Sequence, residues 1–140
     1  MDKKQQPPSK NVEIKSKVVL SEFEYMQTIG TGSFGRVKLA RHKKTNKIYA
    51  VKMLKKAEII KSKQIDHIYS EYTILSMLNH PFIVEMKGIS VTDPKFLDFI
   101  LEYIPGGELF MILRTQGCFP IEQSKSIIIN IKYLDFMPPT

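Results

Sequence analysis

The sequence lacks the features that mark several large classes of protein. It has one cysteine, Cys118, so an internal disulfide is excluded and a reducing cytosolic or nuclear setting is expected. It also has no tryptophan. No run of 18 apolar residues is present, and the first ten residues, MDKKQQPPSK, lack the apolar stretch of a secretory signal. Asp2 stands where N-myristoylation needs glycine. The sequence therefore predicts no membrane partner.

Acidic residues are scarce in one part of the chain. The formal net charge is +7, and residues 36 to 63 hold eleven Lys or Arg but only one acid, Glu58. This basic segment could be a nucleic-acid surface, or it could be solvated loops and helix faces around a phosphate site. The second interpretation is favoured, because stacking aromatic residues are not interleaved with the basic ones as a single-strand binder needs.

What is present is the composition of one globular domain. The chain has 140 residues, of which 43% are hydrophobic and 25% charged. This length and this hydrophobic fraction are enough to form a core. Residues 1–22 are interpreted as a flexible basic tail, and residues 23–140 as the domain.

Hydrophobic periodicity within the domain predicts an α+β fold. Period-two alternation predicts five antiparallel strands. They begin near Phe23 and after Gly35, and cover about 48–54, 83–89 and 96–104. Spacings of three and four predict one main helix and two later ones. These helices are expected at about 62–79, at 108–115 and from Pro120, the last with Ile127, Ile131 and Leu134 on one face.

A glycine-rich loop, Gly30-Thr31-Gly32-Ser33-Phe34-Gly35-Arg36-Val37, follows the first predicted strand. Three glycines in six residues let backbone N–H groups approach phosphate oxygens without obstruction by Cβ atoms. A dinucleotide-binding fold uses the same spacing, but it needs a helix directly after the glycines and an acid about 20 residues later. Here a strand pattern follows, and no acid lies between Ala50 and Leu54. A Walker loop is excluded because GxxxxGK[ST] is absent.

Lys52 and Glu71 form a candidate pair. Lys52 lies on the same predicted strand face as Ala50, so its side chain points inward, where an unpaired ammonium group is costly. Glu71 lies on the apolar stripe of the main helix, three residues after Ile68 and four before Leu75. The two charges could satisfy each other and hold a phosphate. A solvated Glu71 at the edge of the stripe is the alternative.

Together, these features resemble the small lobe of a protein kinase. The segments GTGSFGRV, AVK, HPFIV and LEYIPGGELF, with Glu71 between them, match its signature over about residues 23–134. Within the family, these motifs are most similar to those of the cyclic-AMP-dependent kinase catalytic subunit. Those of the cyclic-GMP-dependent kinase are the next most similar. The resemblance implies a five-stranded antiparallel sheet with one main helix, followed by the first helices of a truncated large lobe.

The resemblance also implies roles for individual residues. The loop from Gly30 to Gly35 would cover the ATP phosphates, with Ser33 and Phe34 at its tip, and Lys52 would hold the α- and β-phosphates while paired with Glu71. Ile29, Val37 and Ala50 would enclose the adenine, whose edge would meet the backbone of Glu102 and Ile104. The remaining implied ligand-contacting positions are Thr31, Gly32 and Arg36 in the loop, Leu101 at the deeper pocket and Glu108 at the ribose and a basic substrate residue.

Several parts of the kinase mechanism have no counterpart in the sequence. There is no HRD-type loop, no DFG and no APE, so the catalytic aspartate and the Mg²⁺ ligands are missing and no metal-binding residue is assigned. Asp135-Phe136 is followed by Met137 rather than glycine. The pattern departs from the family near Asp135, which is interpreted as an alternative ending or a truncated gene model. We therefore expect residues 1–140 alone to be inactive.

Two functions remain open on these grounds. The chain could be part of a Ser/Thr kinase that transfers the ATP γ-phosphate to proteins, with basic substrates and a regulatory subunit implied by the resemblance. It could instead be a non-catalytic kinase lobe that acts as a binding or competitor module. The exposed isoleucines expected on the last helix predict poor solubility or a partner.

Overall fold

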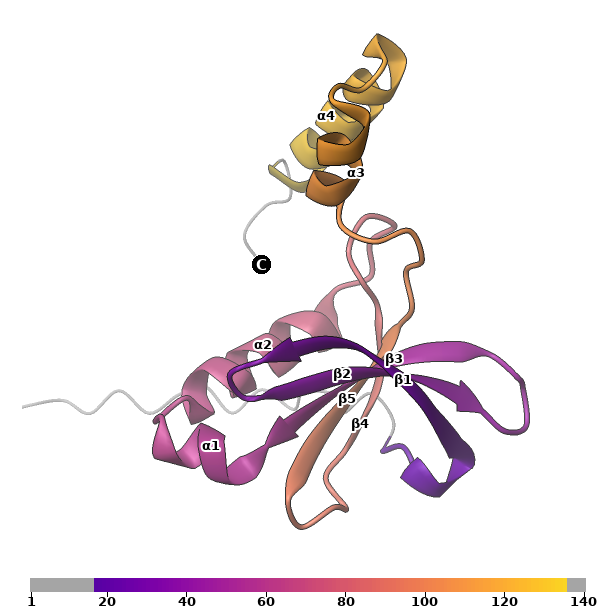
Figure 1. Ribbon diagram of the computed structural model, residues 1–140. Coiled ribbons are helices and arrows are strands. Elements are labelled where there is room, and N and C mark those ends of the chain that lie inside the picture. Colours follow the sequence, from indigo (N-terminus) through magenta and orange to yellow (C-terminus); the bar gives the residue numbers. More distant parts are fainter. Residues whose placement is uncertain (1–16, 136–140) are drawn as a thin grey trace, which may run out of the picture.

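The computed structural model describes residues 17–135, and the side chains of residues 17–130. Predictions about residues 1–16, about residues 136–140 and about the side chains of Ile131 and Leu134 lie outside this range. The described part is an α+β arrangement in which helices lie beside a single five-stranded sheet (Figure 1). The predicted fold class is confirmed.

All five strands pair in antiparallel fashion, in the order β1-β2-β3-β5-β4. The strands are β1 (Phe23–Gly32), β2 (Gly35–His42), β3 (Ile48–Lys55), β4 (Met86–Ser90) and β5 (Phe96–Glu102). β4 begins three residues later than the sequence predicts. His80 holds a turn there, since its carbonyl oxygen accepts from the Ile83 N–H at 3.1 Å and its Nδ1 accepts from the Phe82 N–H at 3.1 Å.

The predicted main helix, at about 62–79, corresponds to α2 (Ile65–Met77). A short helix that the sequence does not predict, α1 (Lys56–Lys61), precedes it. Lys63, between them, has a left-handed φ of 56°, and the Ser62 hydroxyl donates to the Glu58 carbonyl oxygen at 2.6 Å. Neither glycine nor proline separates α1 from α2, so no local signal marks where α1 ends.

The sheet has a different apolar cluster on each face. Leu54, Ile59, Met86 and Phe99 form the cluster on the face covered by α2. Partly buried side chains of α2 complete it: Ile68, Tyr72 and Leu75. Phe23, Ala40, Val51 and Ile100 form the other cluster. Alternation along β3 separates the two, because successive side chains of a strand point to opposite faces.

Residues 17–22 cross the face that α2 does not cover, and we call them the crossing segment. Lys17 forms a parallel bridge with Ile89 of β4, and the Val18 N–H donates to the Ile89 carbonyl oxygen at 3.0 Å. Val18 and Leu20 pack against the second cluster. A short 3₁₀ helix, η1 (Leu20–Glu22), then leads into β1. The sequence predicts a flexible tail here, whereas these six residues contact the sheet.

Two further helices follow the sheet, α3 (Leu109–Gln116) and α4 (Ile121–Asp135), and they project away from it together (Figure 1). No residue of α3 is buried. The exposed fractions are 65% for Phe110 and 53% for both Ile128 and Ile129. Among the residues described, no helix has the length and apolarity needed to cross a membrane.

Candidate functional site

The glycine-rich loop is the β1–β2 hairpin. Gly32 pairs with Gly35, and Ser33 and Phe34 form the turn between them. The three glycines have different surroundings. A Cβ at Gly32 would have no atom within 4 Å, and one at Gly30 would lie 3.7 Å from the Val37 Cβ, an ordinary contact. The space beside Gly32 fits an approach of phosphate oxygens to the backbone.

Gly35 is required by the sheet itself. A Cβ at this position would lie 1.8 Å from the Met53 carbonyl oxygen and 3.2 Å from the Leu54 Cα. Because both atoms belong to the β3 backbone, they cannot move aside as a side chain would. The close contact between β2 and β3 therefore excludes any other residue at Gly35.

Phe34 turns toward the core rather than away from it. Its side chain is partly buried and packs against the cluster of Leu54, Ile59, Met86 and Phe99. The Lys55 N–H donates to the Phe34 carbonyl oxygen at 2.8 Å, which ties the hairpin tip to the end of β3. The sequence predicted Phe34 at the loop tip, but its packing depends on tertiary contacts that no local pattern indicates.

The predicted ion pair between Lys52 and Glu71 is present. The Lys52 Nζ lies 2.6 Å from the Glu71 Oε1, joining β3 to α2. The side chains are 31% and 34% exposed, so the pair is partly buried and still accessible to a ligand. An ammonium group has three donors. Pairing with Glu71 therefore leaves Lys52 able to contact a phosphate as well.

The strand register gathers the predicted apolar residues around Lys52. Val37 pairs directly with Lys52, and Ala50 pairs with Leu101. These side chains share the face of Lys52, since two-residue steps along β3 return to the same side. Ala50 is buried, and Val37 and Leu101 are half-buried. Ile29 lies in β1 and is 44% exposed.

Arg36 is not brought to this face. It pairs with Met53, which packs against the cluster on the opposite face of the sheet. The resemblance placed Arg36 among the predicted ligand contacts because it lies in the glycine-rich loop. The strand register instead directs its side chain away from Lys52.

The segment after β5 carries the remaining predicted residues. The Glu102 N–H donates to the Glu85 carbonyl oxygen at 2.9 Å, so a contact of Glu102 with an adenine edge would have to use its own carbonyl oxygen. Ile104 is exposed, and Glu108 precedes α3 as an exposed residue. Among the described residues, no group of three or more His, Cys, Asp or Glu could hold a metal ion.

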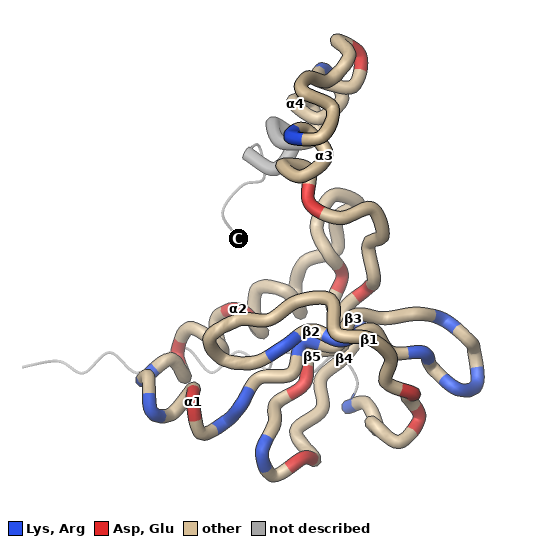
Figure 2. The backbone as a smooth tube through the Cα atoms, in the orientation of Figure 1, with Lys and Arg blue, Asp and Glu red and all other residues tan. Residues whose placement is uncertain are grey.

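Many of the Lys and Arg positions in Figure 2 belong to the basic segment, and several of these residues contact other parts of the fold. Arg41 pairs with Glu24 and Lys44 with Glu22, at 2.6 and 2.7 Å, which lowers the pKa of both carboxyl groups. Lys56 donates to the carbonyl oxygens of Val91 and Asp93, at 3.2 and 2.6 Å. These cations hold strands and turns together.

Comparison with known proteins agrees with this geometry. The model of the protein kinase domain matches residues 23–133, which is well over half of the chain. The chain belongs to the protein kinase family.

Curated relatives narrow the membership to Ser/Thr kinases similar to the cyclic-AMP-dependent enzymes. The chain is 39% identical over 127 residues to the cAMP-dependent protein kinase catalytic subunit of Arthrobotrys oligospora, covering 88% of this chain and 24% of that protein. It is 41% identical over 122 residues to the cAMP-dependent protein kinase type 3 of Saccharomyces cerevisiae, covering 84% and 30%. It is 48% identical over 100 residues to the serine/threonine-protein kinase Sgk1-B of Xenopus laevis, covering 71% and 23%. The chain thus spans less than a third of the length of these relatives.

Proposed function

We propose that the chain is the ATP-binding part of a Ser/Thr protein kinase of the cyclic-AMP-dependent type, whose reaction transfers the ATP γ-phosphate to a protein Ser or Thr. The observation that carries this proposal is the Lys52–Glu71 pair. It lies on the same sheet face as Val37, Ala50 and Leu101, below the glycine-rich hairpin. A cation, an apolar surface and an open backbone loop are what a nucleoside triphosphate requires.

Each group has a defined task in this proposal. Glu71 orients the Lys52 ammonium group, which neutralises charge on the α- and β-phosphates. Backbone N–H groups near Gly32 contact the phosphates, while Ala50 and Leu101 exclude water from the adenine. ATP, when bound, supplies the phosphoryl group that is transferred. The described residues gather no cluster of three or more His, Cys, Asp or Glu that fits Mg²⁺.

We further propose that residues 1–140 bind nucleotide weakly and do not turn over. The sequence holds no HRD, DFG or APE motif, and loss of one preorganised group costs about 10²–10³ in rate in other enzymes. Phosphorylation of a basic Ser/Thr peptide by pure protein would contradict this. Basic substrates, Mg²⁺ and a regulatory subunit belong to the proposal for the complete enzyme.

Nucleotide titration followed by backbone NMR tests the site. We expect Mg-ATP to shift the amide signals of Gly30, Gly32, Lys52 and Leu101, and to leave those of Val18 and Leu20 unchanged. The second pair belongs to the crossing segment, on the opposite face of the sheet, and serves as an internal control. Shifts confined to the opposite face, or spread evenly over both, would refute the proposed site.

A second candidate function is a non-catalytic lobe that binds other proteins. It is favoured by the exposed apolar side chains of α3 and α4, since such surfaces commonly mark contacts. Messenger RNA sequencing discriminates the two functions. An open reading frame that continues past Asp135 into HRD-like and DFG-like segments supports the enzyme, whereas stable 140-residue protein in cells supports the binding module.

A further inference from the structure

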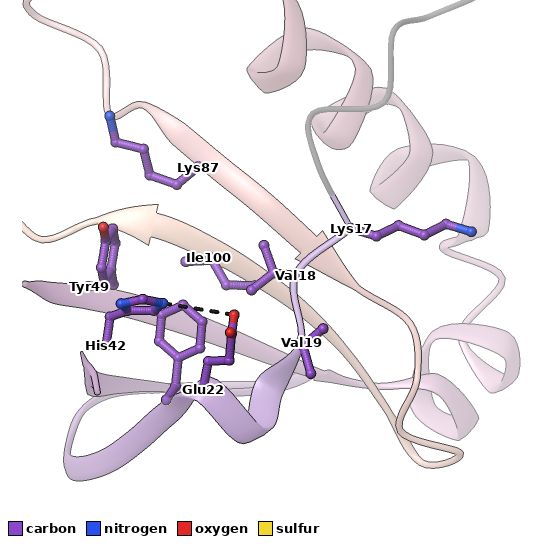
Figure 3. Close-up of a pocket in the computed structure, with 9 residues that line it drawn as sticks. Lys17, Val18, Val19, Glu22, His42, Tyr49, Lys87 and Ile100 are labelled. Atoms are coloured by element: carbon purple, nitrogen blue, oxygen red, sulfur yellow. Dashed lines mark ion pairs between the residues drawn. The ribbon is translucent and has the colours of Figure 1, made fainter. Parts of the chain in front are cut away.

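The crossing segment leaves a cavity of about 260 Å³ between itself and the sheet (Figure 3). Val18 and Leu20 pack against the apolar cluster that contains Val51 and Ile100, and the Val18 N–H donates to the Ile89 carbonyl oxygen at 3.0 Å. A segment with few buried contacts can open locally while the rest of the domain stays folded. The charges around the crossing segment therefore decide how firmly it is held.

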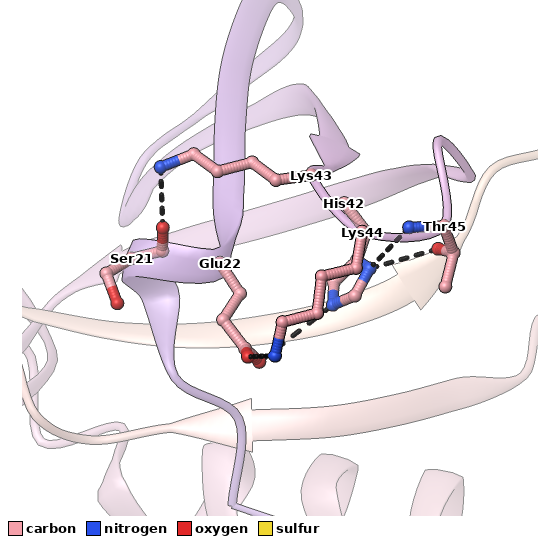
Figure 4. A network of polar contacts seen from close by, with 6 residues as sticks. All are labelled: Ser21, Glu22, His42, Lys43, Lys44 and Thr45. Atoms are coloured by element: carbon pink, nitrogen blue, oxygen red, sulfur yellow. Dashed lines mark hydrogen bonds and ion pairs between the residues drawn. The ribbon is translucent and has the colours of Figure 1, made fainter.

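The end of the crossing segment next to β1 is held by polar contacts with the β2–β3 turn (Figure 4). The Lys43 Nζ donates to the Ser21 carbonyl oxygen at 2.6 Å, and the Lys44 Nζ donates to the Glu22 Oε1 at 2.7 Å. The other carboxylate oxygen, Glu22 Oε2, lies 3.9 Å from the His42 Nε2 (Figure 3). Histidine changes its charge between pH 5 and 8, whereas lysine does not. The contact between His42 and Glu22 is therefore the pH-dependent part of this attachment.

The surroundings of His42 accept a protonated ring. The Phe23 ring packs edge-on against the imidazole, with ring centroids 5.1 Å apart, and the Thr45 hydroxyl lies 3.0 Å from Nδ1. In the protonated ring both nitrogens donate. Nδ1–H then meets the Thr45 hydroxyl, in place of the 3.3 Å bond from the Thr45 N–H, and Nε2–H faces Glu22. Protonation thus turns a weak contact into an ion pair with the crossing segment.

The other charged groups in the walls of the cavity are directed elsewhere. Lys17 projects away from His42 in Figure 3. Lys87 pairs with Glu85 and also faces Glu102, so its charge is offset by two carboxylates. Among the groups that line the cavity, Glu22 is the carboxylate that faces His42.

Asp98 is a second titratable group on the same sheet face. It lies two residues before Ile100 in β5, so both side chains point to one side of the sheet. It pairs with Met53, which packs against the same cluster as Val18 and Leu20. The Asp98 side chain is fully buried, and within the described residues neither carboxylate oxygen has a hydrogen-bond partner. A negative charge at this position favours any opening that lets water reach the face.

The groups around Asp98 do not supply the missing partner. Burial raises the pKa of this carboxyl group to about 6; the charge of Asp93 adds to the rise, and that of Lys56 opposes it. Lys56 donates instead to the carbonyl oxygens of Val91 and Asp93. Burial, with the charges of Asp98 and Asp93, raises the pKa of Tyr25 to about 12, so Tyr25 stays neutral.

We propose that the crossing segment is a pH-sensitive latch, which protonation of Asp98 and His42 closes and loss of these protons loosens. The two groups act in the same direction. Uncharged Asp98 remains buried at little cost, and protonated His42 attracts Glu22, which belongs to the crossing segment. Both groups lie on the face opposite Lys52. The latch therefore does not depend on the proposed nucleotide site.

Hydrogen exchange of the Val18 amide measures the latch, because this N–H is bonded to Ile89 only while the segment is attached. Rates at acidic and neutral pH are converted to protection factors, which removes the intrinsic pH dependence of exchange. If opening returns the pKa of Asp98 from about 6 to 3.8, the Val18 protection factor should fall about tenfold between about pH 5 and pH 7.5. Amides of β3, which has a partner strand on each side, report global unfolding and should stay better protected. A Val18 protection factor that does not change with pH would overturn the proposal.

Two matched double variants identify the groups responsible. Asp98→Asn with His42→Gln should make the Val18 protection factor nearly equal at the two pH values. Asp66→Asn with His67→Gln changes the same residue types at exposed positions of α2 and should keep the tenfold fall of the parent chain. A first variant that retains the pH dependence, or a second that loses it, would refute the latch.

His42→Gln alone leaves the buried Asp98 site intact and tests the other half of the latch. It should lower the Val18 protection factor about twofold at acidic pH, the loss of one partly exposed ion pair, with little change at neutral pH. An equal loss at both pH values would show that His42 acts only through packing and would contradict its role in the latch.

Discussion

The sheet and the α3–α4 pair differ in how much of their apolar surface is buried. The sheet buries residues on both faces, with α2 over one and the crossing segment over the other. α3 has no buried residue, and α4 leaves Ile128 and Ile129 more than half exposed. The sheet is thus a folding unit with its own core, whereas the two helices have apolar sides available for contact with other protein.

This difference suggests where changes in sequence affect stability. Close packing makes the sheet sensitive to a single added atom, because interiors are as dense as molecular crystals. Substitutions on the exposed helices should affect association instead. The following experiments test this contrast, from the largest expected effect on the free energy of unfolding to the smallest.

Gly35→Ala should have the largest effect. The added Cβ would meet the Met53 carbonyl oxygen at 1.8 Å, so β2 and β3 must separate. We expect a loss of about 3 kcal/mol or more, beyond the usual cost of overpacking, measured by urea unfolding. Gly32→Ala is the matched control and should unfold nearly as the parent does, since its Cβ has open space. Equal stability of the two variants would contradict the tight β2–β3 contact.

Asp98→Asn should stabilise the protein at neutral pH. Asp98 is fully buried, and within the described residues neither carboxylate oxygen has a hydrogen-bond partner. Burial raises the pKa of this carboxyl group to about 6, from 3.8. The folded state therefore binds the proton more tightly than the unfolded state. The stability that this carboxyl contributes is complete below pH 4 and is lost as the pH rises through 6.

The expected gain for Asp98→Asn is about 3 kcal/mol at pH 7.5, and it should fall below about 1 kcal/mol near pH 4. Thermal unfolding at the two pH values measures it. Asp66→Asn, on the exposed first turn of α2, is the control and should not show this pH-dependent gain. A destabilised Asp98→Asn protein at pH 7.5 would mean that the buried carboxylate has a stabilising partner.

Ile128→Gln combined with Ile129→Gln should have the smallest effect on unfolding. Both side chains are 53% exposed, and surface changes usually alter stability by less than about 0.5 kcal/mol. Self-association should fall, as size-exclusion chromatography would show. The matched change Ile100→Ala, in the sheet core, should cost about 2–5 kcal/mol. If the double variant melts as early as Ile100→Ala, the helices belong to the same folding unit as the sheet.

The sequence predicts those features that have a local period. Alternation in β3 assigned Lys52 and Ala50 to one face and Val51 to the other, and helical spacing directed Glu71 toward Lys52. Each of these patterns repeats within one strand or one helix, so the sequence of that element is enough to predict it. Their meeting at 2.6 Å follows from α2 packing on the sheet face that holds Lys52.

Features set by tertiary packing could not be predicted in this way. The short helix α1 was not predicted, since no glycine or proline separates it from α2. The burial of Asp98 contradicts the usual exposure of that residue type. Phe34 packs inward because β3 and the core lie beneath the hairpin. The crossing segment follows a polar stretch of the sequence, and its attachment to the core depends on the packing of Val18 and Leu20 against the sheet.

The central claim is that Lys52, held by Glu71, binds the phosphates of ATP. Its most direct test is the affinity of a fluorescent ATP analogue for the parent chain, for Lys52→Met and for Lys55→Met. Lys55 ends the same strand but is exposed and outside the site. Lys52→Met should weaken binding by about tenfold, the loss of one charge-assisted contact, with Lys55→Met unchanged. Equal affinity of the parent chain and Lys52→Met would contradict the claim.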